Sequence, residues 1–115
     1  MKHVKSTTII GAVLLGSACG GGTQVPAQDL AQTQASIRAA SEAGAENDAV
    51  AAARLKVAND TVERARKVAR DGDLESSKAL LKDAQADADL ALALTRAKDA
   101  EDRTIQAKRR LEGLQ

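Results

Sequence analysis

The sequence contains no Phe, Tyr or Trp, only one Pro and one Cys, and a single histidine, His3. Without aromatic side chains the protein has nothing to stack on a base or a sugar ring, so neither nucleic acid nor carbohydrate is an expected ligand. The GxGxxG, GxxxxGK, HExxH, CxxC and GxSxG motifs do not occur in the 115 residues. Together with the short length, these absences predict a protein that is not an enzyme.

No charge of one sign dominates the chain. The 17 Lys and Arg against 16 Asp and Glu give a formal charge of +1, so strong steering toward nucleic acid or anionic lipid is not expected. Two groups of carboxylates resemble cation sites, but neither has the spacing of the 12-residue calcium loop, and we expect no metal ion and no cofactor. These groups are Asp83, Asp87 and Glu101, and Asp71, Asp73 and Glu75.

Residues 1–18 have the features of a bacterial export signal. Lys2 and Lys5 precede an apolar run from Thr7 to Leu15, which is shorter than the roughly 20 apolar residues that span a bilayer. The next residues, Leu15-Gly16-Ser17-Ala18-Cys19, resemble the lipobox of bacterial lipoproteins, with Gly16 in the position where that family prefers Leu. The resemblance implies cleavage before Cys19 and lipidation of its thiol and its new amino group.

The residues after Cys19 predict the location of the protein in the cell and a flexible tether. Gly20, rather than Asp, follows the cysteine, and the same resemblance then implies the periplasmic face of the outer membrane, in a bacterium with two membranes. Residues 19–26 form the lipidated Cys and a flexible tether, since the three glycines favour random coil and Pro26 cannot lie inside a helix. Alternatively, ordinary signal peptidase accepts these small residues or Val25-Pro26-Ala27, and Cys19 without lipid is a free thiol or an intermolecular disulfide partner.

The remaining residues, 27–115, predict one Ala-rich helical domain. More than half of the residues after the signal are Ala, Glu, Lys, Leu or Arg, a composition typical of long helices and coiled coils. Gly44 and Gly72 separate helices expected at residues 27–43, 48–70 and 74–112, with Asn47 capping the second and Asp73 the third. The fold class is therefore all-α: an antiparallel hairpin or three-helix arrangement with one long, coiled-coil-like C-terminal helix.

Apolar residues recur with alternating steps of four and three in the second and third helices. In the second they are Ala51, Leu55, Ala58, Val62, Ala65 and Ala69, widened by Val50 and Val57. The third has a row that we call the long seam: Ala86, Leu90, Ala93, Ala97, Ala100, Thr104, Ala107, Leu111 and Leu114. A second stripe in the third helix, Leu80, Ala84, Ala88, Ala91 and Leu94, ends halfway.

This asymmetry predicts that the first and second helices cover the first half of the third helix on two sides. The second half then projects as a lone helix or contacts a partner through six candidate interaction residues. They are Ala93, Ala97, Ala100, Thr104, Ala107 and Leu111. The basic run Lys108-Arg109-Arg110 either contacts anionic lipid or peptidoglycan carboxylates or complements the dipole at the helix C-terminus.

Residues 19–112 also resemble an uncharacterised family of small Ala-rich bacterial lipoproteins, a domain-of-unknown-function family. The residues that carry the resemblance are Cys19, Gly44-Ala45, Leu55, Ala58, Ala65, Gly72-Asp73-Leu74, Ala79-Leu80, Ala84 and Asp87 to Ala91. The resemblance implies a signal peptide followed by a helical hairpin and carries no assigned activity. A looser similarity links the chain to the major murein lipoprotein, although Gly113-Leu114-Gln115 lacks the lysine by which that protein is joined to peptidoglycan.

The sequence thus favours a structural or adaptor lipoprotein of the cell envelope that acts through helix–helix contacts, with itself or with another helical protein. The alternative is a periplasmic module that binds peptidoglycan or a small ligand without a covalent bond.

Overall fold

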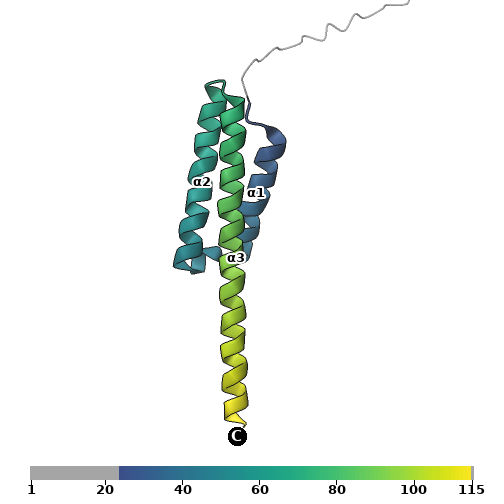
Figure 1. Cartoon of the computed structure of the whole chain (residues 1–115), viewed down its shortest axis with the longest axis vertical. Helices are drawn as coiled ribbons and strands as arrows, with labels where there is room; N and C mark the ends of the chain where they lie inside the picture. The colour runs from purple at the N-terminus through teal and green to yellow at the C-terminus, as the bar shows by residue number, and fades with distance from the viewer. Residues whose placement is uncertain (1–23, 115) are drawn as a thin grey trace, which may run out of the picture.

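The computed structural model describes residues 24–114, which form three α-helices and one 3-10 turn (Figure 1). The elements are α1 (Ala27–Glu42), η1 (Ala45–Asn47), α2 (Ala49–Arg70) and α3 (Leu74–Gly113). No strand occurs within residues 24–114, so the all-α expectation with one long C-terminal helix is confirmed. The signal at residues 1–18, Cys19 and the glycines of the tether lie outside the described residues.

Glycines and aspartates set the ends of the helices. Gly44 and Gly72 have positive φ values of 90° and 94°, the left-handed conformation that glycine adopts at helix C-termini without a Cβ penalty. Asp73 caps α3, since its carboxylate accepts a hydrogen bond from the Ser76 amide at 3.0 Å. The predicted cap of α2 is wrong by one residue. Asn47 belongs to η1, and it is the Asp48 carboxylate that accepts bonds from the Val50 and Ala51 amides at 3.0 and 2.9 Å.

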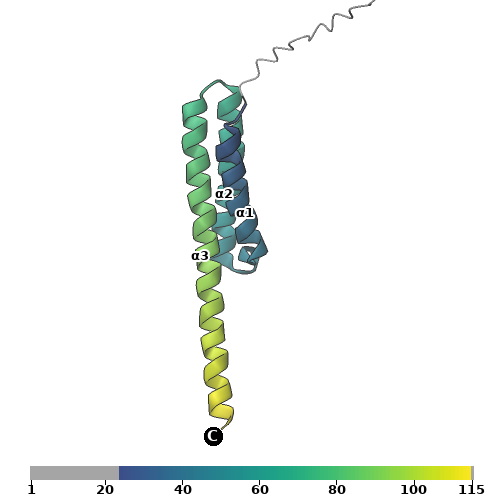
Figure 2. The same ribbon diagram turned by 90° about the vertical axis from the view of Figure 1, so that its right-hand side faces the viewer.

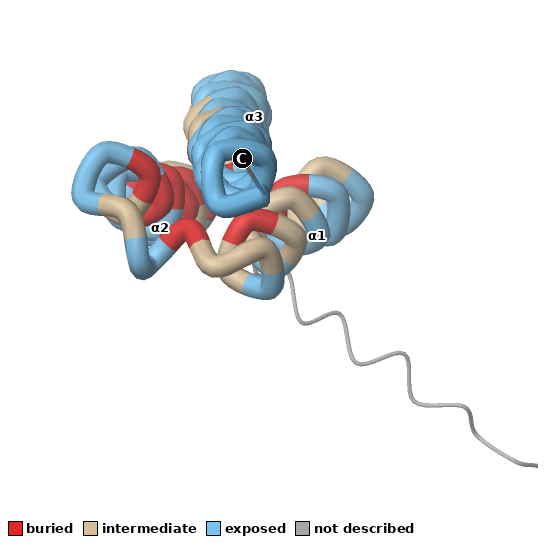
Figure 3. The backbone as a smooth tube through the Cα atoms, turned by 90° about the horizontal axis from the view of Figure 1, so that it is seen from below, coloured by how far each residue is buried: buried red, intermediate tan, exposed pale blue. Residues whose placement is uncertain are grey.

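The helices α1 and α2 lie side by side on one face of α3 (Figures 2 and 3). The two-residue turn before Asp73 makes α2 and α3 an antiparallel hairpin, as the sequence predicts. The helix α1 runs parallel to α3, because Leu30 packs in the cluster that contains Leu81, whereas Ala40 packs in the cluster that contains Ala91. The first two helices therefore share a single face of the third instead of enclosing it from two sides.

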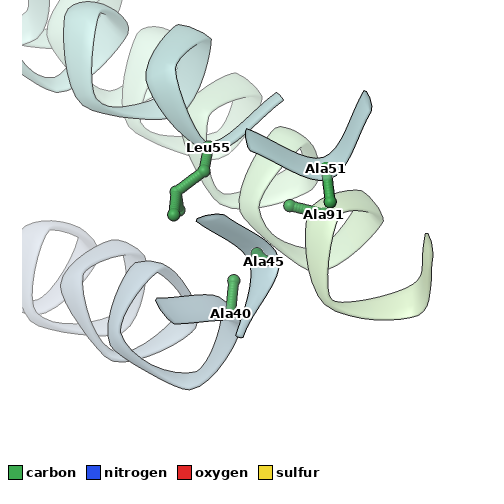
Figure 4. Packing of buried hydrophobic residues seen from close by; sticks show 5 residues of the cluster. All are labelled: Ala40, Ala45, Ala51, Leu55 and Ala91. Carbon is green, nitrogen blue, oxygen red and sulfur yellow. The ribbon is translucent and has the colours of Figure 1, made fainter. Parts of the chain in front are cut away.

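Small side chains fill the core between the three helices. Among residues 24–114, nine of the twelve buried hydrophobic residues are alanines, and Leu81 is the largest of the fully buried side chains. Figure 4 shows one cluster, in which Ala40, Ala45, Ala51, Leu55 and Ala91 converge from α1, η1, α2 and α3. Alanine lets helix axes approach closely, but each side chain removes little apolar area from water.

Buried hydroxyl groups connect the helices through backbone carbonyls. Ser77 Oγ of α3 donates to the Ala65 carbonyl of α2 at 2.9 Å, and Thr33 Oγ1 of α1 lies 2.9 Å from the Leu81 carbonyl of α3. Within residues 24–114, every buried side-chain oxygen or nitrogen has a hydrogen-bond partner. Because their polar atoms are satisfied, Ser and Thr occupy core positions that would otherwise disfavour them.

The predicted α2 seam is confirmed, since all six of its residues are buried. The expectation that Val50 and Val57 widen this seam is wrong, because these side chains are 60% and 44% exposed. Thr61 is buried in their place. In α1, the buried residues are Thr33 and Ala40, and Leu30 and Ile37 are half-buried beside them.

Candidate interaction surface

The face of α3 that packs against α1 and α2 ends abruptly. We call its buried residues the core stripe: Ser77, Leu81, Ala84, Ala88, Ala91 and Thr95. The next positions on the same face are Lys98 and Asp102, which are exposed and charged. No residue from 96 to 114 is buried, and we call this part of α3 the projecting segment. It extends for roughly 28 Å at 1.5 Å per residue, away from the end at which the described chain begins (Figure 1).

The long seam lies on the opposite side of α3. At 100° per residue, its positions are centred roughly 180° from the core stripe. All six candidate interaction residues, Ala93, Ala97, Ala100, Thr104, Ala107 and Leu111, are exposed. Leu90, Leu111 and Leu114 are 41%, 65% and 84% exposed. The structure therefore places the predicted interaction residues in one continuous row that none of the described helices contacts on its outer side (Figure 3).

The expectation that another helix covers the first part of the long seam was wrong. Ala86 and Leu90, in the first half of the helix, were expected to be covered by another helix, and both are exposed. The covered residues belong mostly to the second stripe, in which Ala84, Ala88 and Ala91 are buried. On a helix where both faces carry alanine, residue type does not distinguish the face that packs from the face that does not.

The long seam is apolar even at its threonine. Thr104 Oγ1 donates to the Ala100 carbonyl at 2.9 Å within the same helix, so its hydroxyl is satisfied without a partner. Alanines at the other central positions allow the backbone of a second helix to approach closely, and Leu111 and Leu114 offer larger apolar surfaces near the end. Chemically, this row is suited to contact with another helix.

An open groove of about 450 Å³ lies beside the upper part of the long seam, between α2 and α3. Its walls include Val57 and Thr61 of α2 and Ala86 and Leu90 of α3. Across the same pair of helices, Arg54 Nη1 lies 3.3 Å from Asp87 Oδ1. Exposed apolar surface thus continues from α3 onto α2.

A second open groove, of about 460 Å³, lies between the start of α1 and the end of α2. Val25 and Leu30 provide its apolar part, and Arg66 and Arg70 provide its charge. The Arg66 guanidinium lies 3.1 Å from a Glu63 carboxylate oxygen, which reduces its availability to an anion. The lining of this groove thus combines apolar side chains with two guanidinium groups.

The described residues contain no histidine and no cysteine. Within residues 24–114, no three acidic side chains lie close enough to hold a metal ion, and this includes both carboxylate groups singled out in the sequence. Hydrogen bonds from the side chain and backbone of Ser76 hold the pKa of Asp73 below its ordinary value, which reflects helix capping. The Ser41 hydroxyl donates to a Glu46 carboxylate oxygen at 3.1 Å, in an exposed position near the end of α1.

No family model, curated protein or solved structure matches the chain. The similarity to small Ala-rich lipoproteins therefore stays a prediction that depends on the residues quoted for it. Among the described helices, none combines the length and the apolar character needed to cross a bilayer.

Proposed function

We propose that the protein is a lipoprotein anchored through Cys19 to the periplasmic face of the outer membrane, where it acts as a structural or adaptor protein through helix–helix contacts. The observation that carries the adaptor role is the apolar long seam, which continues to Leu114 although the core stripe of the same helix ends at Thr95. A helix that only stabilised its own bundle would need no apolar row on its outer face beyond that residue.

The positions of the two chain ends support this arrangement. Gln24 follows Cys19 by five residues, which span at most about 18 Å when fully extended. Gln24 lines a groove together with Arg70, the last residue of α2, whereas the projecting segment leaves the opposite end of the bundle (Figure 1). A lipid on Cys19 would thus hold the bundle near the membrane and direct the projecting segment away from it.

The anchor is tested with Cys19→Ser in the full-length chain. We expect the original chain to be found in the membrane fraction with the mass of a lipidated protein, and the variant to lose both properties. Two acyl chains or more anchor a protein stably, at about 0.8 kcal/mol per buried methylene. An unchanged mass and distribution would contradict the anchor without bearing on the long seam.

The helix–helix role is tested with Ala100→Glu, which places a carboxylate in the middle of the long seam. We expect the oligomer or complex seen by sedimentation to be lost while helicity by circular dichroism stays nearly unchanged, because Ala100 is exposed. Lys98→Glu, two residues away on the other face of α3, is the matched control. An oligomer or complex of unchanged size in Ala100→Glu would contradict the role.

A peptidoglycan-binding module is a second candidate, because Lys108, Arg109 and Arg110 are all exposed at the free end of α3. Their charges also complement the helix dipole, which is a sufficient reason for cations at this end of α3. Sedimentation with murein sacculi separates the two functions. Binding that survives Ala100→Glu and is lost when the three cations are replaced would favour the peptidoglycan module.

A further inference from the structure

A row of arginines borders the projecting segment of α3. Arg96, Arg103 and Arg110 recur every seven residues, and each is exposed. Seven residues make nearly two full turns, so the three side chains line up along the helix about 10.5 Å apart. Each arginine directly precedes a residue of the long seam, namely Ala97, Thr104 and Leu111. In heptad notation these seam residues are a positions and the arginines are g positions.

The other edge of the long seam carries mixed charge. Its e positions are Glu101 and Lys108. The three ion pairs of residues 24–114 are Arg54–Asp87, Lys56–Asp60 and Arg66–Glu63. All three belong to the bundled part of the molecule, so in the described residues none of the three g-position guanidinium groups is paired with a carboxylate.

These charges disfavour a second copy as the occupant of the projecting segment. Antiparallel pairing of two projecting segments brings g positions together, so arginine faces arginine, and the pairing of Glu101 with Lys108 at the e positions offsets only part of this repulsion. Parallel pairing brings g against e, and the favourable Arg96–Glu101 contact is then offset by Arg103 against Lys108. Like charges across an interface suppress pairing, and the alanines between them bury too little area to compensate for the repulsion.

We propose that the projecting segment binds an acidic helix: a partner helix with small or aliphatic residues at a and d and carboxylates opposite Arg96, Arg103 and Arg110. This inference rests on the proposed function, in which the long seam contacts a helix. An arginine matches a carboxylate with two parallel hydrogen bonds, and a spacing of about 10.5 Å is the heptad repeat of any helix lying alongside. The apolar row beside the arginines favours a helix over an anionic polymer or lipid, which would leave that row uncovered.

The test uses the full-length chain and two labelled synthetic helices of about four heptads, a length that sustains helicity. Both peptides carry Ala and Leu at a and d, with Glu at e and g in the acidic peptide and Lys in the basic one. Fluorescence anisotropy measures their binding. We expect the acidic peptide to bind at least about tenfold more tightly, and the preference to shrink at high ionic strength.

The variant R96E/R103E/R110E is expected to reverse the preference, so that the basic peptide binds more tightly. The matched control R38E/R64E/K78E makes the same change in net charge on exposed residues of the bundle, and the acidic preference is expected to persist. Circular dichroism of both variants confirms that the helices are retained. Reversal in both variants would show that net charge alone selects the peptide and would overturn the inference.

The remaining outcomes separate this inference from the proposed function. If both peptides bind with equal affinity and Ala100→Glu weakens both, the long seam contacts helices without selecting charge, and only the inference is wrong. If neither peptide binds, the inference and the helix–helix role are both contradicted for the projecting segment. A dimer of the full chain that the acidic peptide does not displace, and that Ala100→Glu breaks, overturns the inference and keeps the helix–helix role.

Discussion

One helix, α3, passes through two environments that differ in what holds it in place. From Leu74 to Thr95 it buries one face against α1 and α2, and its polar core groups bond to backbone carbonyls. From Arg96 to Leu114 it has no buried residue. Most of the stability of a helix in a protein comes from packing of its apolar face, so the projecting segment depends on nucleation from the bundle, on helix propensity and, in our proposal, on a partner.

The two parts of α3 also differ in which of their faces are apolar. In the bundled part, the buried face has Ser77 and Thr95 at its ends, with Leu81 about one turn after Ser77. In the projecting segment that face turns to Lys98 and Asp102, while the long seam keeps Ala97, Ala100 and Ala107. Apolar residues of α3 thus continue along the long seam after its buried face has ended at Thr95, which indicates that the two faces serve different contacts.

The largest expected difference between the two parts is the cost of truncating a leucine. Leu81→Ala removes the largest fully buried side chain and should lower the free energy of unfolding by about 2–5 kcal/mol. Leu111→Ala, at a side chain that is 65% exposed, should change it by less than about 0.5 kcal/mol. Urea denaturation followed by circular dichroism measures the free energy of unfolding of both variants. Similar decreases in the two would contradict the division of α3 into a packed part and a projecting segment.

Replacing an alanine with leucine is also expected to affect the two parts of α3 differently. Ala88→Leu adds volume at a position that is 0% exposed and should destabilise the protein by about 1–3 kcal/mol through overpacking. Ala97→Leu, on the long seam, should leave unfolding nearly unchanged because its side chain is exposed. Thermal denaturation measures the melting temperatures of the two variants. A large decrease in the melting temperature of Ala97→Leu would mean that another part of the chain covers this face.

Smaller effects are expected at the hydroxyl groups. Ser77→Ala deletes a buried hydrogen bond from α3 to the Ala65 carbonyl of α2 and should cost about 1 kcal/mol. Thr104→Ala deletes an exposed bond to the carbonyl four residues earlier in the same helix and should cost close to nothing. The difference is measured by denaturant titration at constant temperature. An equal cost in both variants would show that the bond between the helices contributes no extra stability.

The smallest expected effect is on pH dependence. Because hydrogen bonds from Ser76 lower the pKa of Asp73 in the folded protein, its ionised form favours folding at pH values above the ordinary aspartate range. That contribution is lost as the pH falls through the lowered pKa. Asp73→Asn keeps a capping oxygen but does not ionise, so its melting temperature should fall less between pH 5 and pH 3 than that of the original chain. An identical fall would contradict a role for Asp73 ionisation.

Local signals predicted the helices well. Gly44, Gly72 and Asp73 act through backbone conformation and capping over a few residues, and such signals are readable without knowledge of packing. The six residues of the α2 seam were predicted correctly, whereas Thr61 was missed and Val50 and Val57 were wrongly included. Asn47 and Asp48 both satisfy the preference for a cap, and only the backbone conformation shows that Asp48 takes that position.

Packing between helices was harder to predict. Thr33, Thr61, Ser77 and Thr95 are buried, although their residue types do not mark a core. Thr33 and Ser77 lie at carbonyls of another helix that come within reach only after folding, whereas Thr95 bonds to the Ala91 carbonyl of its own helix. The long seam and the core stripe of α3 have similar compositions, so the choice between them required the positions of α1 and α2. The arginine row at positions 96, 103 and 110, in contrast, is a seven-residue periodicity that the sequence itself contains.

The proposal that the long seam is an interaction surface is tested most directly by comparing the two faces of the projecting segment in intact cells. A photo-crosslinking residue is placed at Ala107, on the long seam, or at Arg109, about 160° away in the direction of the core stripe; both positions are exposed. We expect a discrete crosslinked product from position 107 that is weak or missing from position 109. Equal products from the two positions, or none from position 107, would contradict the claim that the long seam is an interaction surface.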